Sequence, residues 1–321
     1  MKNKIKVSVL CPVYNHEKYL RQTLDSILMQ KTNFKYEVII RDDASTDNTT
    51  EIIKEYQKKY PDIIKPIYEK KNKHNKNDRL FMQMIKYAKG KYTAAIEGDD
   101  YWIDPYKLQK QYDFMENNPE YGLVVTNYKI YNDKTKKTKK SHLKSKDYSI
   151  EEIIIGDGGM FATSSLFTRV ELLNLIDSFY YLSPFEDYVS VLNYALRSQV
   201  HLIKDYTCVY RINAINSWTT MLKEKNESKT RKYLYNEMKA MFEEFNRNTD
   251  NEYIKYTEYL LLTKEFIIHV LDKDIKMMKD RKFKLLYKMG SLKSRFIYFN
   301  KIHFSKTYIY LRNIKHKIEK Y

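Results

Sequence analysis

Residues 36–60 read YEVIIRDDASTDNTTEIIKEYQKKY, and this stretch decides the predicted fold. Its first five residues are rich in aromatic and β-branched side chains and predict a strand. Asp47 can then cap a helix over residues 50–60. A run of acidic and hydroxyl side chains over residues 42–47 separates the two elements. A strand, a polar loop and a helix together form the repeating unit of an α/β sheet.

The same unit recurs through the first 131 residues. Strands are predicted at residues 6–11, 36–40, 63–68, 92–96 and 122–131, and helices at 20–28, 50–60, 80–88 and 105–116. Asn15 can cap the first of these helices. Alternating strands and helices imply right-handed crossovers and a mainly parallel sheet covered by helices. Such a sheet binds ligands at the carboxyl ends of its strands.

Three of these strand ends carry polar clusters, namely CPVYNH at 11–16, RDDASTD at 41–47 and EGDDYW at 97–102. The acidic residues at the second and third ends are Asp42, Asp43, Glu97, Asp99 and Asp100. Helix caps and a solvated turn would explain each cluster alone. Together, however, these carboxylates would repel one another across a small crevice, and a divalent cation or a ligand's donors would relieve the repulsion. Carboxylates favour hard cations such as Mg²⁺ or Mn²⁺, which also hold phosphates.

The charge and the helix breakers divide the chain into two parts. The 321 residues carry a net charge of +17, but residues 276–321 hold 14 Lys and Arg against 2 Asp and Glu, which is +12. After Pro184 no proline follows, and the only later glycine is Gly290, a composition that favours helix. We therefore expect an α/β domain at residues 1–220, which we call the catalytic domain once its motifs are considered below, and a basic, mainly helical region at 221–321.

In their order and spacing, the motifs CPVYNHEKYL (11–20), VIIRDDASTDNT (38–49) and GKYTAAIEGDDYW (90–102), followed by KLQKQ (107–111), resemble the family-2 glycosyltransferases with a GT-A fold. The resemblance covers roughly residues 5–215. It implies inverting transfer of a sugar from a nucleoside diphosphate sugar to a hydroxyl of a glycan or lipid-linked acceptor, in surface polysaccharide assembly. It divides the catalytic domain into a nucleotide-sugar half, 1–132, and an acceptor half, 133–220.

The resemblance also implies roles for individual residues. Tyr14 would pack near the base, and Asp43 would accept the base N–H, which favours uracil because its N3 is a donor. Asp99 would ligate the metal, Mn²⁺ or Mg²⁺, that bridges the diphosphate. Glu97 replaces the usual Asp and would contact the ribose or a metal-bound water. The full nucleotide-sugar set is Pro12, Tyr14, Asn15, Asp43, Glu97, Gly98, Asp99, Asp100, Trp102 and Arg211.

An inverting transfer needs a base for the acceptor hydroxyl, and the resemblance places it in the pair Glu186-Asp187. With Ser183 as N-cap, Glu186 would take the third helical position and close a capping box. Asp187 lies about 100° further round the helix and is free to face the crevice. We expect Asp187 to be the base, with Glu186 as the alternative base or a helix cap.

Four further features leave alternatives open. The turn GDGG at 156–159 borders the acceptor in related enzymes, or is an ordinary connector. Trp102 forms the floor of the sugar site or belongs to the core. Arg211 contacts phosphate or pairs with a nearby acid. Asn213 replaces a metal-binding His of many family members and is a weak ligand by comparison.

The basic tail has two interpretations. Lys and Arg are interspersed with aromatic residues after residue 276, which is typical of helices that lie on an anionic membrane surface. Alternatively, a solvated helical face packs its aromatics on the catalytic domain. With no apolar run near the roughly 20 residues of a membrane span and no recognisable signal peptide, we expect a cytoplasmic protein. It would be peripheral at the inner face of the cell membrane if the tail binds lipid.

Two other functions compete with the glycosyltransferase. The charge of +17 and the 31 tyrosines favour a basic nucleic-acid-binding protein, but acids at the strand ends would repel a polyanion. A metal-dependent nucleotidyltransferase needs a Gly-rich, basic phosphate loop after the first strand, and the sequence has none there. We expect no nucleic-acid partner.

Overall fold

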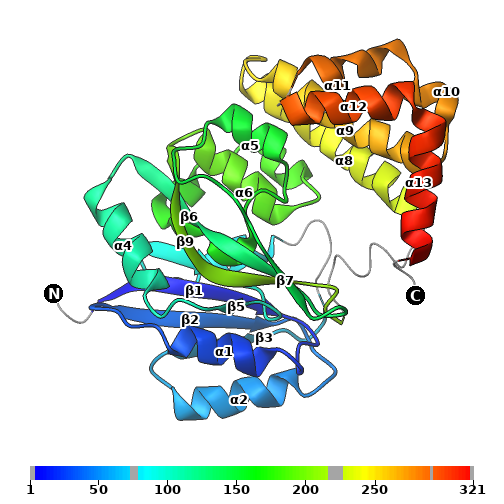
Figure 1. Ribbon diagram of the computed structural model, residues 1–321. Helices are drawn as coiled ribbons and strands as arrows, with labels where there is room; N and C mark the ends of the chain where they lie inside the picture. Colours follow the sequence, from blue (N-terminus) through cyan, green and yellow to red (C-terminus); the bar gives the residue numbers. More distant parts are fainter. Residues whose placement is uncertain (1–3, 73–78, 216–226, 290–291, 319–321) are drawn as a thin grey trace. The chain divides into compact units, whose positions relative to one another are not determined.

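The structure, a computed structural model, describes residues 4–72, 79–215, 227–289 and 292–318. The chain divides into two compact units, Met1–Met221 and Leu222–Tyr321. The first unit contains the sheet, and the second is helical in the part that the structure describes (Figure 1).

The first unit is built on one mixed sheet with the strand order β3-β2-β1-β4-β8-β6-β9-β5 and with β7 paired to β6. The strands are β1 (Ile5–Val13), β2 (Lys35–Asp42), β3 (Ile64–Tyr68), β4 (Tyr92–Ala95), β5 (Tyr101–Trp102), β6 (Tyr121–Asn132), β7 (Lys137–Lys140), β8 (Phe167–Arg169) and β9 (Gln199–Ile212). The strands β3, β2, β1 and β4 are all parallel, as predicted. Beyond β4, in the described residues, β6 and β9 pair in parallel, whereas β8 runs antiparallel to β4 and β6, β5 to β9 and β7 to β6.

Period-two alternation explains why the central strands are buried on both faces. Val9 and Val38 are register partners, and their side chains belong to the larger core cluster on one face of the sheet. Leu10 and Ile39, one residue further on, join a smaller cluster on the other face with Met84. A parallel sheet covered on both faces requires such nearly continuous apolar strands.

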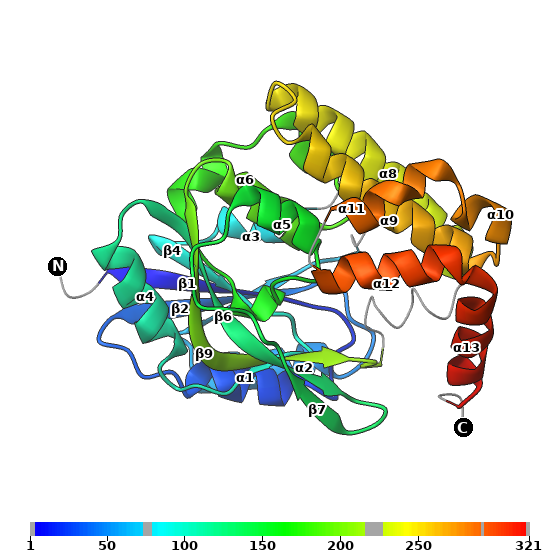
Figure 2. The same ribbon diagram turned by 45° about the horizontal axis from the view of Figure 1, so that its top comes forward.

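Helices cover the two faces unequally (Figures 1 and 2). The helices of the first unit are α1 (Leu20–Leu28), α2 (Thr49–Lys59), α3 (Leu80–Ile85), α4 (Lys107–Asn117), α5 (Ile150–Gly156) and α6 (Glu186–Ala195). Short 3₁₀ segments lie at Thr163–Ser165, Val170–Asn174 and Ser178–Leu182. Apolar residues of α1, α2 and α4 fill the larger cluster, whereas α3 packs on the opposite face. This arrangement confirms the predicted GT-A fold class.

Two predicted helix caps are wrong. The N-cap of α1 is Tyr19, while Asn15 lies outside the helix with φ 54°. The helix α6 begins at Glu186 with Phe185 as N-cap, so Ser183 closes no capping box with Glu186. The Ser183 hydroxyl instead bonds the backbone N–H and carbonyl of Phe185. Because Ser183 and Phe185 are both extended, the helix starts later than predicted. For α2 the N-cap is Asn48.

The expectation of helix after Pro184 is wrong for β9. This 14-residue strand follows α6 and pairs with β6 along most of its length. Its sequence QVHLIKDYTCVYRI is rich in β-branched and aromatic residues and begins with apolar residues at every second position, which favours a strand. A lack of Gly and Pro excludes turns but does not distinguish helix from strand. The short strands β5, β7 and β8 were also not predicted.

The second unit consists of helices, as predicted. They are α8 (Glu227–Asn248), α9 (Ile254–Leu271), α10 (Ile275–Met278), α11 (Leu285–Lys288), α12 (Leu292–His303) and α13 (Ser305–Ile318), with a 3₁₀ turn at Arg281–Lys284. Its core is aromatic, and the Phe266 ring lies 5.2 Å from that of Phe283. Among the helices that the structure describes, none has both the length and the hydropathy needed to cross a bilayer.

Candidate active site

The loops that follow β1 and β2 are linked by hydrogen bonds between side chains of one loop and backbone N–H groups of the other. Asn15 donates its backbone N–H to Ser45 Oγ at 3.0 Å, and its Oδ1 accepts the Thr46 N–H at 2.7 Å. The Glu17 N–H donates in turn to Asp47 Oδ2 at 3.0 Å. Asn15 tolerates its left-handed φ because a short polar side chain can bond the local backbone. Asn15 therefore holds two loops together instead of capping α1.

The predicted base-binding residues lie on these linked loops. Asp43 is 4% exposed, and its backbone N–H donates to the Val13 carbonyl at 3.0 Å. Tyr14, the next residue after Val13, is exposed. Pro12 lies within β1, and its carbonyl accepts the Gly98 N–H at 3.2 Å. The structure thus brings the ends of β1, β2 and β4 side by side, as the sequence predicts.

The acidic loop after β4 is anchored by helix α1. The Thr23 hydroxyl lies 2.9 Å from the Gly98 carbonyl and 2.7 Å from the Asp100 carbonyl. A Cβ at Gly98 would lie 2.5 Å from both Val13 Cγ1 and His16 Nδ1, so only glycine fits without displacing β1. His16 thus contacts this loop, a position that its sequence spacing did not indicate.

Carboxylates from two separate elements form one electrostatic cluster. Burial raises the pKa of Glu97 well above its usual value, and the charges of Asp99, Asp100 and Asp187 raise it further. Burial and Asp99 also raise the pKa of Asp100, against the opposing effect of Arg211. Glu97, Asp99 and Asp100 follow β4, whereas Asp187 lies in the first turn of α6, 90 residues away in the sequence. The repulsion expected from the sequence is therefore present among Glu97, Asp99 and Asp100, whereas Asp42 Oδ1 accepts the Ser45 N–H at 3.0 Å.

Arg211 on β9 is a buried support of the acidic loop. Its Nε donates to the Asp99 carbonyl at 2.7 Å, and its backbone N–H donates to Asp100 Oδ1 at 2.8 Å. Its guanidinium carbon lies between 4.7 and 5.4 Å from the ring centroids of Tyr19, Tyr101 and Tyr131. Only 6% of Arg211 is exposed. Its Nη1 also lies 3.8 Å from Asp133 Oδ1, which matches the predicted alternative of pairing with a nearby acid.

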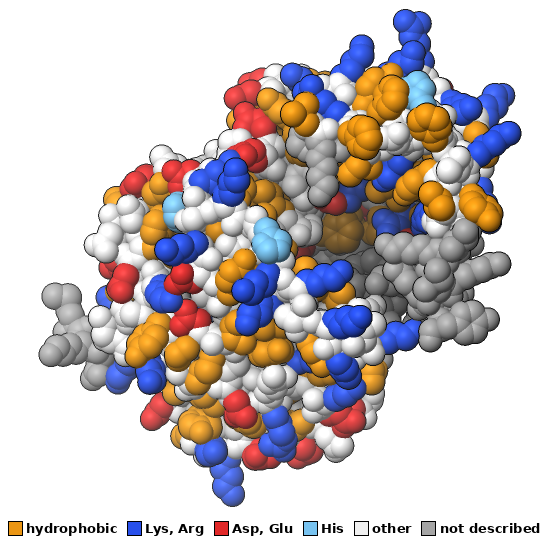
Figure 3. Space-filling view, viewed as in Figure 1, with side chains coloured by type: hydrophobic (Ala, Val, Ile, Leu, Met, Phe, Trp, Pro, Cys, Tyr) orange, Lys and Arg blue, Asp and Glu red, His pale blue; other side chains and the backbone are white. Residues whose placement is uncertain are grey.

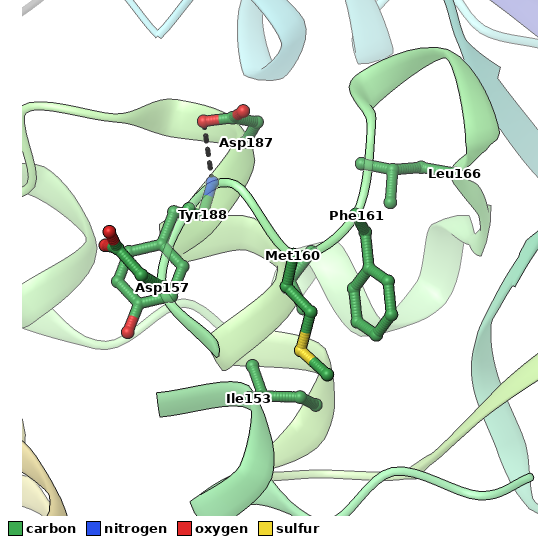
Figure 4. Close-up of a pocket in the computed structure, with 9 residues that line it drawn as sticks. Ile153, Asp157, Met160, Phe161, Leu166, Asp187 and Tyr188 are labelled. Carbon is green, nitrogen blue, oxygen red and sulfur yellow. Dashed lines mark hydrogen bonds between the residues drawn. The ribbon is translucent and has the colours of Figure 1, made fainter. Parts of the chain in front are cut away.

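The two acids at the start of α6 point to different neighbours. Glu186 Oε1 accepts the Met82 N–H at 3.0 Å, in the first turn of α3. Burial raises the pKa of Glu186 to about 7. Asp187 Oδ1 accepts the Tyr188 N–H at 2.8 Å, and the Thr163 hydroxyl lies 3.4 Å from Asp187 Oδ2 (Figure 4). Burial raises the pKa of Asp187 as well.

Asp187 borders a small pocket beside the predicted glycine turn. The lining residues are Ile153, Asp157, Gly158, Met160, Phe161, Leu166, Asp187, Tyr188 and Val191 (Figure 4). Asp157 has φ 61°, and the Tyr128 hydroxyl donates to the Gly159 carbonyl at 3.2 Å. The glycine turn is thus fixed in position next to Asp187. Asp187 also lines a larger, mostly apolar pocket between α3 and α6.

Two further predicted site residues make hydrogen bonds within the protein. Trp102 is 1% exposed, and its indole N–H donates to the Ser164 carbonyl at 3.0 Å, which matches the core alternative. Asn213 has φ 57°, and its Nδ2 donates to Asn132 Oδ1 at 3.2 Å.

The acidic loop suits a hard cation that is shared with a ligand. Within the described part of the chain, no three His, Cys, Asp or Glu side chains are grouped so that they alone hold a metal ion. Mg²⁺ and similar ions, however, are commonly bound by one or two carboxylates together with substrate phosphates. Clustered carboxylates with raised pKa values supply such oxygen donors and gain from a positive charge.

The fold and this acidic, two-element site agree with the GT-A class predicted from the sequence motifs. The model of the family described as "Glycosyl transferase family 2" matches residues 8–173, and the chain belongs to this family. An uncharacterized protein of Mycobacterium tuberculosis is 33% identical over 214 residues, which are 66% of this chain and 60% of that protein. A poly(ribitol-phosphate) beta-glucosyltransferase of Bacillus spizizenii is 34% identical over 115 residues, 36% of this chain and 18% of that enzyme.

Two solved structures have a similar fold. One is TarS 1–349 of S. aureus in complex with UDP-GlcNAc, with a TM-score of 0.60 and 20% identity over 83% of this chain and 72% of that chain. The other is the mannosyltransferase PcManGT from Pyrobaculum calidifontis in complex with GDP-Man and Mn²⁺. Its TM-score is 0.55 at 14% identity, over 99% of this chain and 88% of that chain. At these identities the likeness shows the fold alone.

Proposed function

We propose that this glycosyltransferase moves a sugar, with inversion, from a UDP-sugar to a hydroxyl of a glycan or lipid-linked acceptor in surface polysaccharide assembly. The observation that carries the proposal is the shared electrostatic cluster of Asp187 with Glu97, Asp99 and Asp100. In this cluster the acids of the proposed donor site, which follow β4, interact with the proposed proton acceptor on α6. The donor half would be residues 1–132, the acceptor half 133–220, and residues 221–321 a separate helical region.

The donor nucleotide would lie against the linked loops after β1 and β2. Tyr14 would pack near the base and Asp43 would accept its N3–H, so that a uracil base is favoured. One of the two similar structures is a complex with UDP-GlcNAc and the other a complex with GDP-Man. They therefore support a nucleotide-sugar donor but do not distinguish uracil from guanine. The uracil preference rests on the Asp43 carboxylate, because an ionised carboxylate can only accept hydrogen bonds and the uracil N3–H is a donor.

Asp99, with Asn213 as a weak further ligand, would hold Mn²⁺ or Mg²⁺. When bound, the ion would supply Lewis-acid stabilisation of the departing diphosphate. The presence of Mn²⁺ in the PcManGT complex supports this choice of metal. Glu97 would contact the ribose or a metal-bound water, while Arg211 and Thr23 keep the loop in place through its backbone.

Asp187 would remove the proton of the acceptor hydroxyl. Its Oδ1 is engaged by the Tyr188 N–H, whereas Oδ2 has only the longer contact with Thr163, so Oδ2 is the favoured proton acceptor. A carboxylate whose pKa is raised by burial is a stronger base than an exposed one. As the acceptor oxygen bonds the anomeric carbon from one side, the bond from that carbon to the diphosphate oxygen breaks on the other. The pocket beside the glycine turn would admit the acceptor hydroxyl.

Calorimetry with UDP and Mn²⁺ tests the donor site. We expect metal-dependent UDP binding that weakens at least about tenfold in Asp99→Ala, because one charge-assisted metal contact is lost. Asp62→Ala, an exposed carboxylate in the turn between α2 and β3, is the matched control and should bind as the unmodified protein does. UDP binding that is equal with and without metal, or unchanged in Asp99→Ala, contradicts the assignment. A screen of UDP-sugars for transfer would then identify the donor sugar.

A further inference from the structure

Helix α12 has apolar side chains on two faces, and only one face packs into its own unit. On the inner face, Ile302 is 4% exposed and the Tyr298 ring lies 5.7 Å from that of Phe266. On the outer face, Leu292 is 83% exposed and Phe296 is 69% exposed. A surface helix of a soluble domain normally turns charged and polar residues outward. The outer face of α12 therefore lacks the composition expected for contact with water alone.

The outer apolar residues form a continuous stripe. Leu292, Phe296 and Phe299 are spaced four and three residues apart, which places them on one side of the helix. Leu311 on α13 is exposed, and so is Phe304, which lies in the turn immediately before α13. The buried residues of α13, including Ile309, are at other positions. We call these outer residues of α12, α13 and the turn between them the apolar stripe.

Positive charge accompanies the apolar stripe. Residues 292–312 contain no Asp or Glu, and their cations are Lys293, Arg295, Lys301, Lys306 and Arg312. Figure 3 shows hydrophobic side chains intermixed with Lys and Arg in the upper right of the view, where Figure 1 places α10 to α13. Nearby on α11, Lys288 is exposed, as is Lys306 on α13.

We propose that α12 and α13 bind the surface of an anionic phospholipid bilayer. The apolar stripe would enter the boundary between headgroups and acyl chains while the surrounding Lys and Arg contact lipid phosphates. Charge complementarity selects this partner. A second copy of the same face would bring like charges together without any acidic residue in 292–312 to offset them. The proposal does not depend on the catalytic assignment, because it concerns binding and involves none of the site residues.

Co-sedimentation of the full chain with vesicles tests the proposal. Vesicles of phosphatidylcholine alone are compared with vesicles that contain 30% phosphatidylglycerol, in 0.1 M and 0.5 M NaCl. We expect binding to the anionic vesicles only, weakened several-fold by the higher salt. The variant Leu292→Ser/Phe296→Ser should bind at least about tenfold more weakly, because its two most exposed apolar side chains are lost. Lys288→Glu/Lys306→Glu should lose a similar factor.

Matched control variants distinguish binding through the apolar stripe from nonspecific binding by exposed aromatic or basic residues. Tyr87→Ser/Tyr233→Ser removes two exposed aromatic residues elsewhere, and Lys35→Glu/Lys58→Glu makes the same change in net charge on β2 and α2. Both should bind anionic vesicles as the unmodified chain does. Circular dichroism that matches the unmodified chain would show that each variant is folded.

Equal binding to neutral and anionic vesicles would overturn the proposal, as would losses in the control variants equal to those in the stripe variants. Analytical ultracentrifugation supplies a further arm. A concentration-dependent dimer that disappears in Leu292→Ser/Phe296→Ser, without any vesicle binding, would overturn the proposal and assign the apolar stripe to a second copy of the chain.

Discussion

The loops on the donor side of the site and the acids on its catalytic side are held in opposite ways. After β1 and β2, hydrogen bonds such as that from the Thr46 N–H to Asn15 Oδ1 join the two loops directly. After β4 and at the start of α6, like charges lie together, and burial disfavours their ionised forms. The first region is complete by itself, whereas the second has an electrostatic cost that a cation, a proton or a ligand relieves.

This difference predicts that substitutions in the two regions have different main effects, on stability in one and on catalysis in the other. A side chain in the donor loops should contribute mainly to stability, and through stability to binding. A carboxylate in the acidic region should contribute mainly to catalysis, and its removal should relieve repulsion. Catalytic sites commonly concentrate such perturbed groups. Three substitutions test the comparison.

The largest effect is expected from Asp187→Asn. The amide has the same shape but cannot take a proton from the acceptor, so transfer should fall by about 10³-fold. UDP binding measured by calorimetry should remain within about twofold, since we assign Asp187 to the acceptor side. Single-turnover transfer from a UDP-sugar is the readout, with Asp62→Asn as the control. If transfer stays within tenfold of the unmodified enzyme, the base is Glu186 or another group.

A smaller effect, on stability, is expected from Glu186→Gln. The pKa of Glu186 is raised from 4.5 in a model peptide to about 7 in the folded protein, so the folded state binds this proton more tightly than the unfolded state. The resulting stabilisation is fully present below about pH 4.5 and is lost as the pH rises through 7. At 1.36 kcal/mol for each unit, the loss amounts to at most about 3 kcal/mol.

Urea unfolding between pH 5 and 8 checks this expectation. The free energy of unfolding of the unmodified chain should fall, relative to Glu186→Gln, as the pH increases. Glu55→Gln, at an exposed position on α2, should run parallel to the unmodified chain. Parallel curves for Glu186→Gln would show that the Glu186 carboxylate is ionised as easily in the fold as in water.

The smallest effect is expected in the donor loops, from Asn15→Ala. It removes the acceptor for the Thr46 N–H and places a less tolerant residue at φ 54°, so stability should fall by about 1–2 kcal/mol. Asn15→Gly also loses the acceptor but tolerates the backbone angle, and should lose less. Chemical denaturation of both variants separates the two causes. A larger loss for glycine than for alanine would contradict the role given to the left-handed backbone.

The residues predicted from sequence were those governed by local pattern. The strands β1 to β4 and the acids at their ends follow from alternating apolar residues and from the rule that parallel strands end at one edge. The capping box at Glu186 was wrong, because its partner Met82 lies 104 residues away in the sequence. The burial of Trp102 beside Ser164 is likewise decided by tertiary packing.

The missed strand β9 has a different cause. Its segment was assigned from the absence of Gly and Pro, a signal shared by helices and strands. Its content of β-branched and aromatic residues was the signal that favoured a strand. Arg211 lies on β9, so a prediction that misses this strand also misses the hydrogen bonds from Arg211 to the acidic loop.

The long sequence separation between Arg211 and the residues it bonds also affects the order in which the site forms during translation. Arg211 bonds Asp99 and Asp100 from 112 and 111 residues further along the chain, and Trp102 pairs with Cys208 on the same strand. A nascent polypeptide that ends before β9 contains Asp99 and Asp100 but lacks Arg211 and the strand that hold them in position. The acidic loop is therefore completed only after nearly the whole first unit has left the ribosome.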